Sequence, residues 1–174
     1  MSYIQTRQKL NFERQLAAVD VSIKHYAIRD PNEANDLACA ISRNFPEHKM
    51  LRLGLVELLL NAIEHGNLEI GFDLKTKLLN SDTYIATIRK RLSDPAFRHR
   101  HVDLYIDLCP ETLTFTIFDQ GRGFNPTPYK KWDMDRAALP HGRGIALACQ
   151  SCFDKVNYNK IGNTVKCTYQ TAVA

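Results

Sequence analysis

A carboxylate and a carboxamide stand one helical turn apart within residues 57–67, Glu-Leu-Leu-Leu-Asn-Ala-Ile-Glu-His-Gly-Asn. Glu57, Asn61 and His65 recur at four-residue steps, so on a helix they share one face. The carboxamide oxygen is a hard ligand that suits Mg²⁺, and the carboxylate can take the proton of an attacking hydroxyl. This polar motif (residues 57–67) therefore predicts a helix that serves a metal–phosphate complex, although the same stripe would also suit the solvated side of a surface helix.

Two glycine-containing motifs follow in the sequence. The first glycine motif (residues 119–123, Asp-Gln-Gly-Arg-Gly) ends an alternating apolar run that predicts a strand. A carboxylate at that place, Asp119, would be partly buried and would need a donor, for which the amino group of adenine is suited. The second glycine motif (residues 141–144, His-Gly-Arg-Gly) opens a stretch of helical period, where free backbone N–H groups favour phosphate. Each glycine pair alone would equally suit a tight turn.

In this order the motifs resemble the nucleotide-binding domain of the GHKL (Bergerat) superfamily, which includes gyrases, histidine kinases and certain chaperone and mismatch-repair ATPases. The resemblance covers about residues 35–171. The polar motif stands at the N box of the superfamily, the two glycine motifs stand at its glycine boxes, and residues 162–165 (Gly-Asn-Thr-Val) resemble its last box. The chain is most similar to the anti-sigma factor serine/threonine kinases and to ATP-binding domains attached to bacterial response regulators.

The resemblance implies an α+β fold, a two-layer α/β sandwich in which helices cover one face of a mixed, mostly antiparallel sheet. It implies ATP and Mg²⁺ as cofactors, with Glu57 as the catalytic base and Asn61 as the metal ligand. The residues that it implies for nucleotide binding are Asn61, Asp119, Gly121, Gly123, Gly142, Arg143, Gly144 and Thr164. The implied activity is transfer of the ATP γ-phosphate to a serine or threonine of a partner protein, a sigma factor or an anti-sigma factor antagonist. A homodimer stays open.

Two other classes of function stay open as well. An ATP-gated binding module, which sequesters a sigma factor or its antagonist without kinase activity, would keep every nucleotide-binding residue. An adaptor for nucleic acid or a membrane surface would use the basic residues that precede the strand predicted at 102–108. The modest net charge of +4 and the lack of aromatic residues alternating with the basic ones argue against that adaptor. We therefore expect neither nucleic acid nor a membrane as the partner.

The rest of the sequence predicts the elements that would hold these motifs in place. Strands are predicted at residues 21–28, 102–108, 112–118, 155–159 and 164–171, and helices at residues 30–45, 49–65 and 145–153. The helix at 49–65 is expected to face the core through the apolar stripe Leu53, Val56, Leu60 and Ile63. Residues 4–18 are expected to form a helical or extended lead-in, and residues 125–140 stand where the superfamily has its ATP lid.

Residues 68–101 form an insert, because compact relatives need only a brief connection at this place. Helical spacing at 74–79 and 83–92 predicts two helices, since a structureless loop of this length is unusual in a compact domain. The insert carries a basic cluster of Arg89, Lys90, Arg91, Arg98, His99, Arg100 and His101. The cluster suits partner docking or an anionic surface, but we favour a solvated helical hairpin that covers the sheet edge or the nucleotide pocket.

Composition limits the remaining classes. The 174 residues, 44% hydrophobic and 24% charged, fit one histidine-kinase-like ATPase domain (1–174) with an N-terminal extension at 1–20. No stretch approaches the ~20 apolar residues that span a bilayer. No apolar signal core follows Met1. We therefore expect a bacterial, cytoplasmic protein.

The five cysteines include Cys149 and Cys152 in a C-x-x-C spacing. Because no second such pair completes a zinc site, they are interpreted as small buried thiols rather than as a metal or redox pair.

Several polar residues near the motifs keep more than one interpretation. His65 would either contact phosphate or fix the end of the helix, and Asn67 would either contact phosphate or terminate the helix. Arg122 is expected to point to solvent, Asn125 is expected to cap the lid, and Glu64 has no assigned role.

Overall fold

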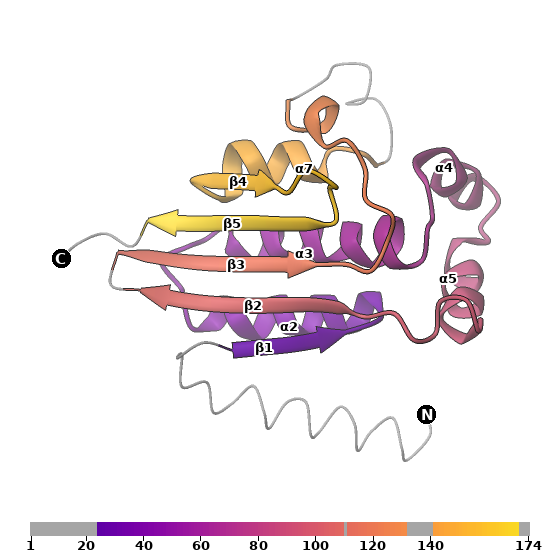
Figure 1. Ribbon diagram of the computed structural model, residues 1–174, viewed down its shortest axis with the longest axis horizontal. Coiled ribbons are helices and arrows are strands. Elements are labelled where there is room, and N and C mark those ends of the chain that lie inside the picture. The colour runs from indigo at the N-terminus through magenta and orange to yellow at the C-terminus, as the bar shows by residue number, and fades with distance from the viewer. Residues whose placement is uncertain (1–23, 110, 132–140, 171–174) are drawn as a thin grey trace, which may run out of the picture.

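A computed structural model of the 174-residue chain describes residues 24–109, 111–131 and 141–170 (Figure 1). The predicted lead-in at 4–18 and the N-terminal extension at 1–20 lie outside the described residues, as does the larger part of the expected lid.

Five strands form one sheet in the order β1-β2-β3-β5-β4 (Figure 1). They are β1 (Lys24–Ile28), β2 (Val102–Cys109), β3 (Thr112–Phe118), β4 (Lys155–Tyr158) and β5 (Thr164–Gln170), close to the predicted bounds. Every pairing among these strands is antiparallel, so the described sheet is not mixed. Strands β2 and β3, and likewise β4 and β5, follow each other directly in the chain, and such short connections join antiparallel neighbours.

Helices cover one face of the sheet and give the two-layer α+β sandwich that was expected (Figure 1). They are α2 (Pro31–Arg43), α3 (Leu51–Asn61) with its π-helical continuation η1 (Ala62–Asn67), and α7 (Gly144–Leu147) with its continuation η3 (Ala148–Cys152). Strand β3 directs Leu113, Phe115 and Ile117 into the core, because successive residues of a strand point to opposite faces. Among the helices described here, none is both long and apolar enough to cross a membrane.

Helix α2 begins at a capping box. The Asp30 carboxylate accepts hydrogen bonds from the backbone N–H groups of Asn32 at 2.7 Å and Glu33 at 3.0 Å. In return, the Glu33 carboxylate accepts from the backbone N–H of Asp30 at 3.2 Å. Pro31 occupies the first turn, where its missing N–H is not needed.

Only part of the predicted stripe of α3 faces the core. Ile63 is buried as predicted and the half-buried Val56 and Leu60 pack against the core, but Leu53 is 39% exposed. A β-carbon at Gly54 would lie 2.5 Å from the ring of Phe153, so the helix packs through the side where its glycine lets that ring approach. Apolar residues occur on nearly every side of α3, so the periodicity of its sequence does not define a single core-facing side. The buried apolar residues are Leu51, Leu55, Leu58 and Leu59 and, in η1, Ala62 and Ile63.

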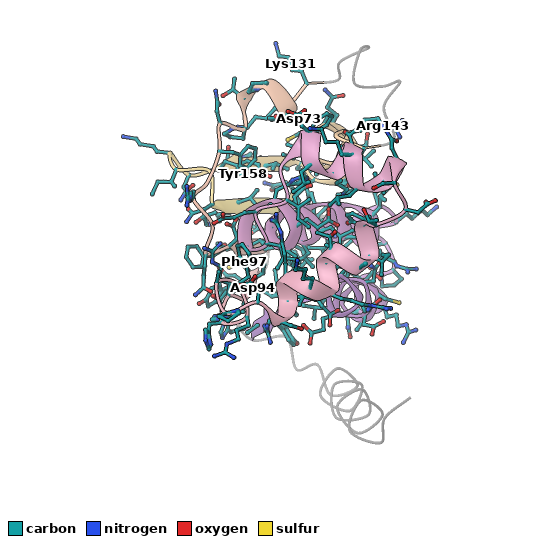
Figure 2. The ribbon with its side chains drawn as sticks, turned by 90° about the vertical axis from the view of Figure 1, so that its right-hand side faces the viewer. Asp73, Asp94, Phe97, Lys131, Arg143 and Tyr158 are labelled. Carbon is teal, nitrogen blue, oxygen red and sulfur yellow. The ribbon has the colours of Figure 1, made fainter. Side chains whose placement is uncertain are left out.

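The insert forms the two predicted helices, α4 (Phe72–Asn80) and α5 (Tyr84–Ser93), at one end of the sheet (Figures 1 and 2). Arg100 donates to the carbonyl of Asn67 at 2.9 Å, and Arg91 donates to the carbonyl of Leu68. Both guanidinium groups also lie over the ring of Phe97, at 5.3 Å for Arg91 and 5.2 Å for Arg100. Part of the basic cluster therefore holds the insert against the end of η1.

Replacing Gly54 by alanine is expected to destabilise the fold by about 1–3 kcal/mol, since the added methyl group would overpack against Phe153 and Cys152. Gly71→Ala is the matched control, because a β-carbon there meets no atom within 4 Å and the backbone φ is −64°. Gly71 is the N-cap residue of α4, where alanine is less favoured than glycine, so the control should lose some stability but less than Gly54→Ala. Urea denaturation measures both variants, and equal midpoints would show that α3 does not pack through Gly54.

Candidate functional site

A cavity of about 230 Å³ lies between residues of α3 and η1 on one side and residues of β3 and β5 on the other, next to the start of α4. All three motifs reach it. The polar residues and glycines of the motifs that line it are Asn61, His65, Gly66, Asp119, Gly123, Gly142 and Gly144. The largest apolar and aromatic residues on its wall are Leu58, Phe72, Ile117, Phe124, Tyr129, Ile145, Tyr158 and Val165. The polar motif and the two glycine motifs, far apart in the sequence, thus surround one cavity.

Asp119 is the buried carboxylate of the site, at 8% exposure. Its Oδ1 accepts a hydrogen bond from the backbone N–H of Gly121 at 2.9 Å, and its own backbone N–H donates to the Asn163 carbonyl at 3.0 Å. Burial raises the pKa of Asp119 to about 6, while the Gly121 hydrogen bond and the positive charge of Arg100 oppose that rise. The carboxyl group is therefore held in a fixed direction at the cavity wall with capacity for a further donor.

The polar motif does not continue as a regular α-helix to its end. Residues Ala62–Asn67 form a π-helix, a feature that often occurs at functional sites. Its last turn lies directly against the first glycine motif, because Gly66 has no side chain and a β-carbon there would overlap the carboxyl group of Asp119. The Oδ1 atom of Asn67 accepts the backbone N–H of Gln120 at 2.7 Å. Asn67 thus joins the helix end to the glycine turn and also terminates the π-helix.

Glu57 lies behind the second glycine motif rather than on the cavity wall. Its half-buried carboxylate packs against the α-carbon of Gly144, so closely that a β-carbon there would overlap it. Burial raises the pKa of Glu57; the positive charges of Lys75 and Arg143 act against this rise, and the negative charge of Glu64 adds to it. A carboxylate with a raised pKa is a better proton acceptor near neutral pH.

Asn61 is a side chain of the cavity wall that could contribute a ligand to a metal ion. It lines the cavity, and its carboxamide has no hydrogen-bond partner within the described part of the chain. In residues 24–109, 111–131 and 141–170, no group of three or more His, Cys, Asp and Glu side chains could hold a metal by itself. Asn61 therefore fits Mg²⁺ of the kind that keeps waters and phosphate oxygens as its other ligands.

Three other predicted residues do not line the cavity. Gly121 packs beneath it, where a β-carbon would lie 2.5 Å from the Gly66 carbonyl. Arg143 is exposed at the start of α7, at the same end of the molecule as α4 (Figure 2). The hydroxyl of Thr164 accepts a hydrogen bond from the Asn159 side chain at 3.1 Å, and its neighbours Asn163 and Val165 reach the cavity in its place.

Three polar residues that flank the motifs are His65, Arg122 and Asn125. His65 contacts the Ile70 carbonyl through Nδ1, which fixes the chain after η1, and its ring also lines the cavity. Burial lowers the pKa of His65. Arg122 points to solvent, with its side chain 90% exposed. The side chain of Asn125 accepts the backbone N–H of Thr127 at 3.0 Å, just before the short 3₁₀ turn η2 (Thr127–Tyr129), whose N-cap residue is Pro126.

Sequence reasoning missed the aromatic part of the wall. Phe72 comes from the insert, Tyr129 from η2, and Tyr158 from the end of β4. Only Phe124, which directly follows the first glycine motif, stood next to a recognisable signal. The wall gives the cavity apolar surface on which a flat ring can pack.

The expectation of buried thiols holds for Cys152 and Cys167, whereas Cys39 and Cys149 are only partly buried and Cys109 is exposed. All five are free. Burial raises the pKa of Cys149 and of Cys152, which disfavours the reactive thiolate. The two residues lie within η3, away from any group of metal ligands in the described residues.

The fold and the cavity define a two-layer α+β protein with a mixed polar and aromatic site between its layers. A search with models of known protein families found no match to the chain, and a search of curated proteins found no significant similarity.

Asp119→Asn tests the environment of the buried carboxyl group. Its folded-state pKa of about 6 lies above the unfolded value of ~4. The native state therefore binds the extra proton between these values, and the parent loses stability as pH rises from about 4 to about 6. The variant cannot titrate there but keeps an oxygen for Gly121. We expect its stability relative to the parent to rise over this range by about 2 kcal/mol and then stay level.

Urea denaturation at pH 4, 5, 6 and 7 measures this difference. Asp36→Asn, at an exposed position of α2, is the control for the same change of residue type outside the site. A constant difference between parent and Asp119→Asn across the whole range would mean that Asp119 titrates normally.

Proposed function

We propose that this chain is an ATP-binding regulatory protein of the GHKL type, and that it acts as a serine/threonine protein kinase. The observation that carries the proposal is the convergence of the polar motif and both glycine motifs on one cavity. Asp119 lies in its wall beside η1, and Glu57 lies behind the second glycine motif. A base-recognising carboxyl group and a proton acceptor are thus provided at different parts of one site.

The end of the cavity around Asp119 suits an adenine ring. The carboxyl group accepts Gly121 N–H through one oxygen, which leaves acceptor capacity for an exocyclic amino group. Tyr158 and Phe124 offer apolar surface for the flat ring, and their own rings meet edge to face at 5.5 Å between centroids. The base would therefore be recognised by one polar contact and by packing.

The end around the second glycine motif suits phosphates. Gly142 has a φ of +93°, which glycine adopts readily, and its α-carbon lies against the ring of Phe72. Backbone N–H groups at the start of α7 and the cation of Arg143 favour negative charge there. Asn61 would hold Mg²⁺, which when bound screens the charges of the phosphates.

Glu57 would take the proton of a serine or threonine hydroxyl on the partner protein as that oxygen attacks the γ-phosphorus. The bond from the γ-phosphorus to the bridging oxygen of ADP breaks, and ADP leaves. Such transfer depends mainly on positioning and electrostatics. The partner would be a sigma factor or an anti-sigma factor antagonist in the bacterial cytoplasm, where ATP is supplied.

The second candidate is an ATP-gated binding module that sequesters such a partner without significant kinase activity. It shares every nucleotide-binding residue with the kinase and differs only in whether Glu57 is needed. The position of Glu57 behind Gly144 favours the kinase, because a carboxylate with a raised pKa at the phosphate end has no role in simple sequestration.

Calorimetric titration with ADP and with a non-hydrolysable ATP analogue, with and without Mg²⁺, tests the nucleotide site. The parent should bind both, and Asp119→Ala should bind at least about tenfold more weakly, as expected when a buried hydrogen bond to a base is lost. Asn61→Ala should lose the Mg²⁺-dependent part of the affinity. Asp36→Ala and Asn157→Ala, at exposed positions, serve as matched controls. A folded parent that binds neither nucleotide would refute the proposal.

Glu57→Ala separates kinase from binding module. The variant should bind nucleotide like the parent, because Glu57 does not line the cavity, and should lose phosphoryl transfer by a factor of about 10²–10⁴. Transfer is measured as label from γ-labelled ATP on serine or threonine of proteins that co-purify with the chain. Glu47→Ala, at a side chain 59% exposed, is the control. Equal labelling by parent and Glu57→Ala would remove Glu57 from the mechanism.

A further inference from the structure

Helix α4 of the insert bridges two walls of the site. Lys75 Nζ lies 2.5 Å from the Glu64 carboxylate on η1. On the next residue, Thr76 Oγ1 lies 2.9 Å from His141 Nε2 in the second glycine motif. The ring of Phe72 lies 4.4 Å from the His141 ring, between centroids, and lines the cavity. One helix thus connects the polar motif with the second glycine motif at the end shown in Figure 2.

Lys75 is a largely buried cation at this end. Its side chain is 17% exposed, that of Glu64 is 3% exposed, and the ammonium also lies 5.5 Å from the centre of the Tyr84 ring. An ammonium group has three N–H donors, and the bond to Glu64 uses one of them. Lys75 can therefore keep its ion pair and still donate to a second acceptor.

The negative charges near Lys75 would have to be offset if a phosphate group bound beside them. Glu57 and Glu64 bring two carboxylates to the phosphate end, and they would repel a polyphosphate unless cations offset them. Lys75 lies close enough to act electrostatically on Glu57 and on His141 as well as on its partner Glu64. His141 also has a buried Nδ1 atom without a hydrogen-bond partner in the described residues. Glu57, Glu64, Lys75 and His141 thus form one polar cluster, in which only Glu57 has a role in the proposed function.

A purely structural role for the pair is the simpler reading, in which Lys75 and Glu64 only fasten α4 to η1. A buried ion pair, however, usually adds little to folding stability, because apolar residues of similar size in its place often give the same or a higher stability. The apolar contact of Phe72 with Gly142 and the bond between Thr76 and His141 already fasten α4 to the site. A buried lysine beside the phosphate end therefore calls for another role.

We propose that Lys75 is a phosphate-binding residue supplied by the insert, and that it makes the site favour a nucleoside triphosphate over the diphosphate. Glu64 is its positioning residue: it holds the ammonium group at η1, while the next residue of α4, Thr76, contacts His141 of the second glycine motif. This inference rests on the proposed nucleotide site and adds to it the residue that would bind the terminal phosphate of the triphosphate.

The test compares affinities for a non-hydrolysable ATP analogue and for ADP, each with Mg²⁺. Lys75→Met alone would leave the Glu64 carboxylate buried and unpaired, so the informative variant is the double change Glu64→Gln with Lys75→Met. Glu64→Gln alone retains the ammonium, and Lys75→Arg retains both charge and pair. Lys77→Met removes an exposed lysine of the same helix and is the matched control. Circular dichroism establishes that each variant is folded.

The parent, Lys77→Met and Lys75→Arg should all bind the ATP analogue more tightly than ADP. Glu64→Gln should keep a smaller preference, because its ammonium group is no longer held by the ion pair. The double variant should lose roughly tenfold or more in affinity for the analogue, as expected for a lost charge-assisted hydrogen bond, while its ADP affinity changes about twofold at most. An unchanged ratio of the two affinities in the folded double variant, or in Lys75→Met where it folds, would overturn the role of Lys75. A parent that binds neither nucleotide would instead refute the nucleotide site itself, before any variant is compared.

Discussion

The close approach of η1 to the first glycine motif is the constraint on which the rest of the site depends. No β-carbon fits between residue 66 and the carboxyl group of Asp119, and the α-carbon of Gly121 packs in turn on the carbonyl of Gly66. Asn67 closes the contact through the backbone N–H of Gln120. With any larger residue at position 66, the helix layer and the end of β3 would separate, and Asp119 would lose the burial that shapes its chemistry. The cavity exists because two backbones can meet there without side chains.

Three carboxyl groups lie close together around the cavity, and each has either a raised pKa or a charged partner. Burial raises the pKa of both Asp119 and Glu57, whereas Glu64 is paired with Lys75. Keeping three carboxyl groups in half-buried or buried surroundings works against folding stability unless each has a partner or a proton. Perturbed carboxyl groups that gather around one cavity are more typical of a functional site than of a structural core. The insert belongs to this arrangement, since it brings the lysine that balances the cluster.

The sequence allowed the strands, the start of α2 and the three motifs to be predicted because each depends on neighbouring residues. Alternation of Leu113, Phe115 and Ile117 marks a strand facing a core, and Asp30 with Glu33 marks a helix start. The core side of α3 could not be predicted, since its choice depends on Phe153, far along the chain. Likewise nothing local indicates that Phe72 and Thr76 meet His141, or that the polar motif ends as a π-helix. The features that could not be predicted are those that depend on contacts between segments far apart in the sequence.

The walls of the cavity come from α3 and η1, from the insert, from the end of β3 and from the β4–β5 hairpin, so no single segment contains a partial version of it. Only the fully folded chain can therefore bind a ligand there, and occupancy must be linked to global unfolding. A ligand at 100 times its dissociation constant would add about 2.7 kcal/mol to the free energy of unfolding. The melting temperature of this chain should accordingly report cavity occupancy, and in the cell its lifetime against proteolysis would rise and fall with the supply of whatever fills the cavity.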